Sequence, residues 1–192
     1  MKFNLDKSVT LLELLIAMSL LGLLVIGISS IETFSRYQLT SAGIRSRLQN
    51  EVSFLLEHMA KNVNMAIGDY SNLPVDTSSI DGDTAIRVYV DLTSGGLPPG
   101  DGKRGAGGDC WIAYRFRPAT SYQIWYYANY SGPSSANETI AHDITDFTAS
   151  YSNSNNYIEV IATACANPPC GSINHPNVTM TSRIEMPSVS LH

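Results

Sequence analysis

The chain has 192 residues, of which 44% are hydrophobic and only 15% charged, and its formal net charge is −5. This acidic balance excludes a typical nucleic-acid-binding protein, which needs a surplus of Lys and Arg on its binding face. The apolar content excludes an intrinsically disordered chain, and three cysteines are too few for a fold built on disulfides.

Residues 9–31 form a long apolar run in which Glu13 carries the single formal charge. About 20 such residues cross a bilayer as a helix. We therefore predict a transmembrane helix rather than a buried core helix, which would be shorter and would have a polar face. Two lysines in the short leader, residues 1–8, place that end in the cytoplasm and the rest of the chain beyond the membrane. A secretory signal peptide cut near Ser30 is an alternative, although the run is long for one.

Glu13 is the most informative residue of this run, because a carboxylate inside a bilayer costs about 3 kcal/mol or more. Either it lies near the cytoplasmic interface, where its side chain reaches water, or it needs a cationic partner. No Lys or Arg occurs between Lys7 and Arg36. An amine created by cleavage just before Val9 would provide that partner, from the same chain or from a neighbour.

The segment from Ser8 to Ala17, SVTLLELLIA, resembles the prepilin cleavage and methylation motif of type IV pilins and type II secretion pseudopilins. The resemblance implies that a prepilin peptidase cuts between Ser8 and Val9 and that Val9 becomes the N-methylated terminus. It also implies that Glu13, the fifth mature residue, pairs with the terminal amine of an adjacent subunit during filament assembly. Ser8 and Val9 stand where the family usually has Gly and Phe, so we expect cleavage to be retained but slower.

Apolar residues recur at spacings of three and four beyond the membrane run, which predicts that the helix continues through residues 32–68 with one apolar stripe. The stripe consists of Leu48, Val52, Leu55, Met59, Val63 and Ala66. Gly68 is the expected C-cap. Residues 47–66 also resemble, more loosely, the same region of J-type minor pseudopilins and W-type minor pilins.

Residues 69–192 are rich in Gly, Ser, Asn, Thr and Tyr, and strand patterns replace the helical period. The strand candidates are 84–92, 110–116, 122–130, 139–151 with an interruption, 157–163 and 178–186. We predict an α+β fold of the pilin-like type, in which a long N-terminal helix, first transmembrane and then amphipathic, packs on an antiparallel β-sheet domain. The strands are expected to cover the apolar stripe of the helix, as one sheet or split in two.

Cys165 and Cys170 enclose a short loop with two prolines, which favours a disulfide in an oxidising exported compartment. Zinc is the competing interpretation, but its further ligands would have to come from Cys110, His142 or His175, and these show no recognisable spacing. Cys110 begins a predicted strand and is expected to be a buried small residue. Its pairing with either of the other cysteines stays open.

Asp81, Asp83 and Asp101 are loop carboxylates, and such hard oxygen ligands could hold calcium. Asp-Gly pairs are also ordinary turn chemistry, and no EF-hand pattern is present, so no cofactor is expected apart from this calcium candidate. An aromatic group is expected to lie mainly in the core with cross-strand pairs, rather than on an adhesive surface. It comprises Tyr122, Trp125, Tyr126, Tyr127 and Tyr130.

No enzyme is expected, because the four histidines show no motif spacing and nucleophile-elbow, zincin and P-loop patterns are absent. The residues and the resemblance together predict a minor pilin or pseudopilin of the bacterial inner membrane, with a cytoplasmic N-terminus and an extracytoplasmic C-terminal domain. It would later enter a type IV pilus or a type II secretion pseudopilus. The expected partners are other pilin or pseudopilin subunits, a prepilin peptidase, the inner-membrane assembly platform and the lipid bilayer. A stand-alone membrane-anchored binding domain, a secreted protein and a major pilin are the alternatives.

Overall fold

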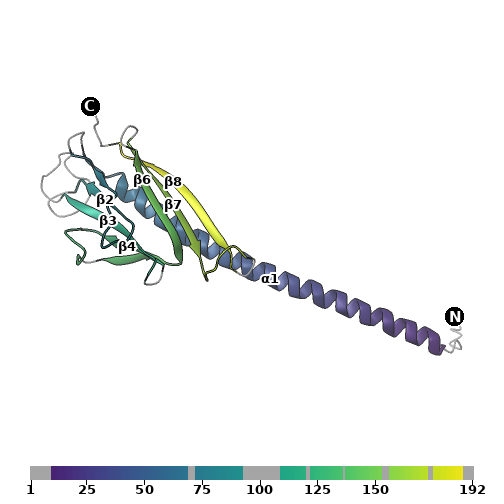
Figure 1. Ribbon diagram of the computed structural model, residues 1–192. Coiled ribbons are helices and arrows are strands. Elements are labelled where there is room, and N and C mark those ends of the chain that lie inside the picture. Colours follow the sequence, from purple (N-terminus) through teal and green to yellow (C-terminus); the bar gives the residue numbers. More distant parts are fainter. Residues whose placement is uncertain are drawn as a thin grey trace. The chain divides into compact units, whose positions relative to one another are not determined.

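The computed structural model describes residues 10–68, 72–92, 109–119, 122–135, 137–152, 156–172 and 175–187. The chain divides between Ala42 and Gly43 into two compact units. The described part of the first unit is helical and belongs to α1, Leu11–Val63. The second unit contains the remainder of α1 and all the described strands (Figure 1).

Helix α1 ends at Val63, earlier than the predicted end at Gly68. The amide of Ala66 donates to the carbonyl of Val63 at 2.9 Å, a short-range bond that tightens the chain after the helix. Ala66 then forms a β-bridge with Val90, so the chain has already joined a sheet. Gly68 is not the C-cap. A Cβ atom at this position would lie 2.7 Å from Cδ of Pro74, so glycine is needed there for the close approach of the returning chain.

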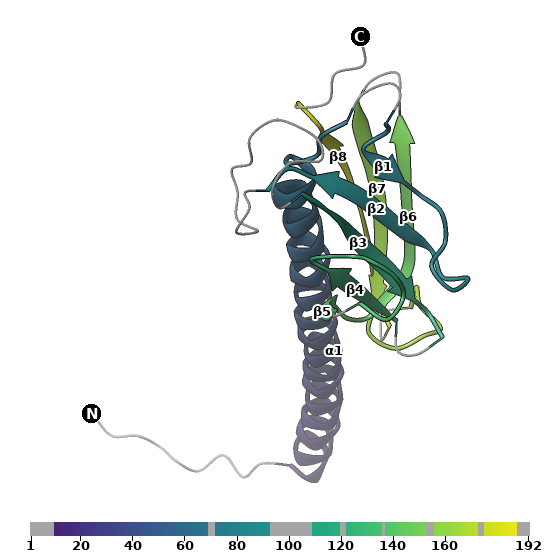
Figure 2. The same cartoon turned by 90° about the vertical axis from the view of Figure 1, so that its left-hand side faces the viewer.

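All the described strands pair antiparallel and form two sheets, one with the order β1-β2-β3-β4-β5 and one with the order β6-β7-β8 (Figure 2). In chain order the strands are β1 (Val75–Asp76), β2 (Ala85–Val90), β3 (Cys110–Arg117), β4 (Gln123–Tyr127), β5 (Glu138–Ala141), β6 (Ile144–Ser152), β7 (Tyr157–Cys165) and β8 (Asn177–Glu185). Of the two predicted arrangements, the split one is therefore present.

The predicted strands are confirmed with shifted bounds. The candidate 139–151 is two strands, β5 and β6, and the predicted interruption falls at His142 and Asp143. Asp143 takes a positive φ of 59° there, which turns the chain from one sheet into the other. The candidate 122–130 was too long, because β4 ends at Tyr127. Strand β1 was not predicted, since two residues are too few to show an alternating pattern.

Within the second unit, both sheets cover the apolar stripe of α1. All six predicted stripe residues have an exposed fraction of 0% and belong to one core cluster. The sheets contribute inward-facing side chains to this cluster, among them Ile86, Val88, Tyr114 and Ile124 from the five-stranded sheet and Ile158, Val160 and Ile184 from the three-stranded sheet. Burying each large apolar side chain stabilises the fold by about 1.5–3 kcal/mol. This confirms the predicted packing of helix on sheet.

Candidate functional site at the start of the helix

The first turn of α1 is closed by a reciprocal pair of side chains, those of Thr10 and Glu13. The amide of Glu13 donates to Oγ1 of Thr10 at 3.2 Å. In return, Oε2 of Glu13 accepts a hydrogen bond from the amide of Thr10 at 2.9 Å and another from its hydroxyl at 3.0 Å. This is a capping box with Thr10 as N-cap, and it satisfies two amides that have no partner inside the helix. The Thr-x-x-Glu spacing is its sequence signature, and this spacing alone could have predicted the pair.

The predicted cleavage and methylation residues, Ser8 and Val9, lie outside the described residues. Thr10 is the first described residue, so the structure places the Glu13 carboxylate against the residue that directly follows Val9. Glu13 is exposed within the first unit. Its described contacts are with the amide and hydroxyl of Thr10, and both groups are neutral. Its negative charge is therefore held in place by hydrogen bonds without being compensated by a cation in the described part of the chain.

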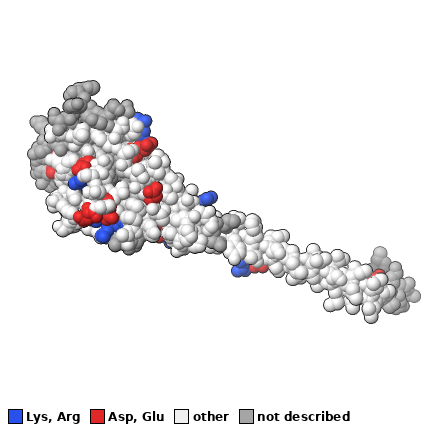
Figure 3. Space-filling view, in the orientation of Figure 1, with Lys and Arg blue, Asp and Glu red and all other residues white. Residues whose placement is uncertain are grey.

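From Leu11 to Ile31 the helix presents exposed apolar side chains around its whole circumference. By length and composition, α1 contains a stretch that could cross a membrane. The hydroxyls of Ser19 and Ser30 donate to backbone carbonyls four residues earlier, at 2.6 and 2.9 Å, so they are satisfied within the helix. Glu13 is the one charged side chain of this stretch, and the N-terminal turns are accordingly almost free of charge in the space-filling view (Figure 3).

The cysteines lie in the second unit. Cys165 and Cys170 form a disulfide, with Cα atoms 6.1 Å apart. Cys110 is free and half-buried at the start of β3, and burial raises the pKa of its thiol, which keeps it protonated near neutral pH. Among the described residues, no group of three or more His, Cys, Asp or Glu side chains is arranged to hold a metal ion.

Two of the calcium candidates, Asp81 and Asp83, bind an arginine. Arg115 is only 5% exposed, and its Nη1 and Nη2 lie 2.9 Å from an oxygen of Asp81 and 2.8 Å from an oxygen of Asp83. The carboxylates are brought together by a tight turn in which Gly82 has a φ of 85°. The guanidinium thus takes the carboxylate oxygens that a calcium ion would need. The third candidate, Asp101, lies outside the described residues.

The aromatic group lies mainly in the packed interior, as predicted. Tyr126 and Tyr127 are buried, and Trp125 and Tyr130 pack against a small second cluster on the outer side of the five-stranded sheet. The exception is Tyr122, which is 38% exposed. A cross-strand pair of the expected kind joins Tyr126 to Tyr114, with ring centroids 5.1 Å apart.

Comparison with known families adds one finding. Residues 4–29 match a family model described as the prokaryotic N-terminal methylation motif. No curated protein and no solved structure matches the chain. The matched segment includes Ser8, Val9 and Glu13 and most of the apolar stretch. It supports a type IV pilin-like family and a pilin-type precursor processed by a prepilin peptidase. Together with the apolar helix, it also points to membrane anchoring and to a structural rather than a catalytic subunit.

Proposed function

We propose that this chain is a minor pilin or pseudopilin, a structural or priming subunit of a type IV pilus or of a type II secretion pseudopilus. The observation that carries the proposal is the methylation motif at residues 4–29, together with Glu13 as the single charge of the apolar run 9–31. A prepilin peptidase removes residues 1–8. Val9 then becomes the N-terminus and is methylated on its amine.

Glu13 is the residue that drives assembly in this proposal. A carboxylate held at the edge of the hydrocarbon is only partly hydrated and therefore costly, and its described contacts, those with Thr10, are with neutral groups. The new amine of Val9 on an adjacent subunit is a cation, and it lies at about the same depth in the membrane as Glu13. Pairing the two recovers the cost only when subunits stand side by side in one register, so it favours an ordered filament over dispersed monomers.

The remaining parts of the chain take their roles from this arrangement. The leader lies in the cytoplasm, residues 9–31 span the inner membrane, residues 32–63 continue the helix, and the chain beyond Val63 completes the extracytoplasmic domain. The inner-membrane platform and neighbouring pilin-type subunits are the partners during assembly. A minor rather than a major subunit is favoured by the resemblance of residues 47–66 to minor pseudopilins and minor pilins.

The experiment that tests the proposal is the intact mass and N-terminal sequence of the chain, taken from membranes with and without a prepilin peptidase. We expect a methylated chain that starts at Val9 only when the peptidase is present. A bulky residue in the Ser8→Phe variant should leave the Met1 start, while Ser29→Phe should be processed normally. A Met1 start in all samples would indicate a stand-alone anchored domain, and a start near Ser30 would indicate a secreted protein. Either result contradicts the proposal.

The minor role has its own measurement. The copy number of the chain in sheared filaments should be far below that of the main subunit. A chain that makes up the bulk of the filament would be a major pilin.

A further inference from the structure

Four side chains encircle α1 directly beyond the apolar stretch: Glu32, Phe34, Arg36 and Tyr37. Successive residues are about 100° apart around an α-helix, which puts the charged pair on one side and the two aromatic residues on the other. Nη2 of Arg36 lies 2.6 Å from Oε1 of Glu32, and their side chains are 79% and 60% exposed. Phe34 and Tyr37 are 64% and 56% exposed. We call these four residues the belt.

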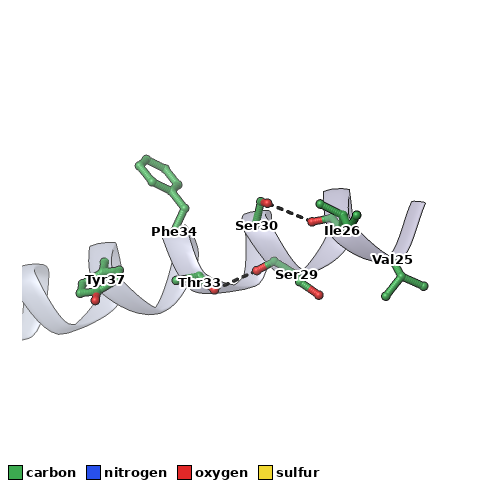
Figure 4. Close-up of a pocket in the computed structure, with 7 residues that line it drawn as sticks. All are labelled: Val25, Ile26, Ser29, Ser30, Thr33, Phe34 and Tyr37. Carbon is green, nitrogen blue, oxygen red and sulfur yellow. Dashed lines mark hydrogen bonds between the residues drawn. The ribbon is translucent and has the colours of Figure 1, made fainter. Parts of the chain in front are cut away.

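A shallow hollow lies along the aromatic side of the belt (Figure 4). It is lined by Val25, Ile26, Ser29, Ser30, Thr33, Phe34 and Tyr37. The hydroxyls of Ser30 and Thr33 are turned back onto the carbonyls of Ile26 and Ser29, at 2.9 Å each. The hollow therefore offers an apolar surface that carries no unsatisfied hydroxyl at these two positions, with an aromatic rim at one end. Such a surface suits the part of a lipid acyl chain next to the headgroup better than it suits a polar ligand.

The length of the helix places the belt at a membrane boundary. The stretch from Leu11 to Ile31 measures about 32 Å at 1.5 Å per residue, close to the ~30 Å of a bilayer hydrocarbon core. The belt begins at the next residue. Glu13 lies about 35 Å before Arg36 along the helix axis, so a belt held at one interface leaves Glu13 within one turn of the other.

We propose that the belt binds the phospholipid headgroup region of the leaflet opposite the leader, and that this contact fixes the depth of Glu13 near the cytoplasmic interface. The inference rests on the membrane insertion contained in the proposed function. Arg36 has five N–H donors, so its guanidinium can keep Glu32 and also bind a lipid phosphate. Phe34 and Tyr37 lie on the other side of the helix, at the level where aromatic residues gather in membrane proteins. The belt thus sets the register in which Glu13 and the amine of a neighbour meet.

The depth of the helix can be measured by cysteine labelling. The full chain, leader included, is reconstituted alone in phosphatidylethanolamine–phosphatidylglycerol vesicles, with Cys110→Ser as background and either Leu12→Cys or Ile16→Cys. A membrane-impermeant maleimide is supplied to both faces. With the belt intact, Leu12→Cys should react about tenfold faster or more than Ile16→Cys, because one turn separates interface from hydrocarbon. Replacing Phe34, Arg36 and Tyr37 together by Ser should bring this ratio close to one, because the helix then samples several depths.

Two controls make the result specific. Leu39→Ser removes an apolar residue that is 72% exposed but lies outside the belt, and it should leave the ratio unchanged. Arg36→Gln, which removes the cation, should lower the ratio in the phospholipid vesicles. In vesicles of a phosphate-free glycolipid, the chain with the intact belt should show the same lowered ratio. The proposal is overturned if the triple Ser variant keeps the original ratio, if Leu39→Ser lowers it equally, or if the ratio responds to the belt only when other pilin subunits are present. Rapid labelling at both positions in every sample would instead mean that the chain does not insert, which contradicts the proposed function itself.

Discussion

Nδ1 of His58 on α1 lies 3.1 Å from the hydroxyl oxygen of Tyr114 on β3. Asn62, one turn further along the helix, donates from its amide to the same hydroxyl at 3.1 Å and to the carbonyl of His58 at 2.8 Å. The His58 ring also stands edge-on against Tyr126, with ring centroids 4.7 Å apart. This cluster places a titratable group inside the contact between helix and sheet in the second unit.

Acid should destabilise the second unit through His58. Burial lowers the pKa of His58 below its ordinary value; Glu138 opposes this shift and Lys61 adds to it. The unfolded chain therefore takes up a proton at His58 at a higher pH than the folded chain does. The free energy of unfolding consequently falls as the pH drops below about 6.5, and above that range the contribution of His58 is constant.

Guanidinium unfolding of the full chain in detergent, at pH 7.5 and pH 5.0, measures this effect. The loss of stability between the two pH values should be smaller in His58→Gln than in the natural sequence. His142→Gln is the matched control, because His142 is exposed, and it should behave like the natural sequence. An equal loss in the natural sequence and in His58→Gln would show that His58 does not couple protonation to folding.

Arg115→Met should cost about 3 kcal/mol, the lower end of the cost of breaking a buried ion pair. The substitution leaves Asp81, which is half exposed, without its cation, and it leaves Asp83 with only the longer contact to Nε of Arg117, at 3.6 Å. Arg47→Met is the control, because Arg47 pairs with Asp143 at the surface, where such pairs contribute less than about 1 kcal/mol. Chemical unfolding of the two variants gives the comparison, and equal costs would mean that the Arg115 pairs are not specially important.

Calcium should not stabilise the described part of the second unit. A ligand that binds only the folded state raises the melting temperature as its concentration increases, but Arg115 already holds both carboxylates of the Asp81–Asp83 turn. We expect the same melting temperature in millimolar calcium and in EDTA. A rise with calcium that is lost in Asp101→Asn would instead place the ion at the third candidate, and a rise lost in Asp83→Asn would mean that calcium displaces Arg115.

Reduction of the disulfide should destabilise the second unit by about 2 kcal/mol, the modest value expected for so short a loop. Alkylation before and after reduction, read by mass, should block one thiol first and three afterwards, since Cys110 is free. Cys110→Ser should then show none before reduction and two after it. Finding Cys110 oxidised, with Cys165 or Cys170 as the free thiol, would contradict the Cys165–Cys170 bond.

The local patterns of the sequence predicted the helix, every described strand apart from β1, and the buried side of the helix, although several bounds shifted. Leu48, Val52 and Leu55 follow the helical period, and a side chain's position in that period decides whether it meets the sheets. The strands were predicted from runs of β-branched and aromatic residues, because these too are local patterns. The Thr10–Glu13 pair was equally local and could have been predicted from its spacing.

Features that depend on distant residues could not be predicted in this way. The helix stops at Val63 because Ala66 pairs with Val90 in a β-bridge, and Gly68 is needed because Pro74 returns beside it. The pairing of Arg115 with Asp81 joins residues 34 positions apart, and that of His58 with Tyr114 joins residues 56 apart. None of these contacts has a signature within one helix or strand. The sequence therefore suggested Asp81 as a calcium ligand, whereas in the structure it is paired with Arg115.

The two roles of Glu13, capping the helix and carrying a charge, can be separated by substitution. Glu13→Gln keeps a side-chain oxygen that can accept the hydrogen bonds from Thr10 but removes the charge. Thr10→Val keeps the charge but removes the hydroxyl of the capping box. We expect both variants to be processed and inserted in the membrane. Glu13→Gln should be about tenfold or more depleted from sheared filaments, because the loss of a pair worth more than 1.4 kcal/mol changes a partition by that factor.

Thr10→Val should enter filaments at close to the normal level, since weakening one N-cap costs only about 1 kcal/mol. The measurement is the fraction of each variant in filaments relative to its membrane pool, with all other subunits present. Glu13→Leu, which removes both roles, should be as depleted as Glu13→Gln. The opposite pattern, with Glu13→Gln incorporated normally and Thr10→Val excluded, would mean that Glu13 serves assembly by starting the helix and that its charge has no partner in the filament.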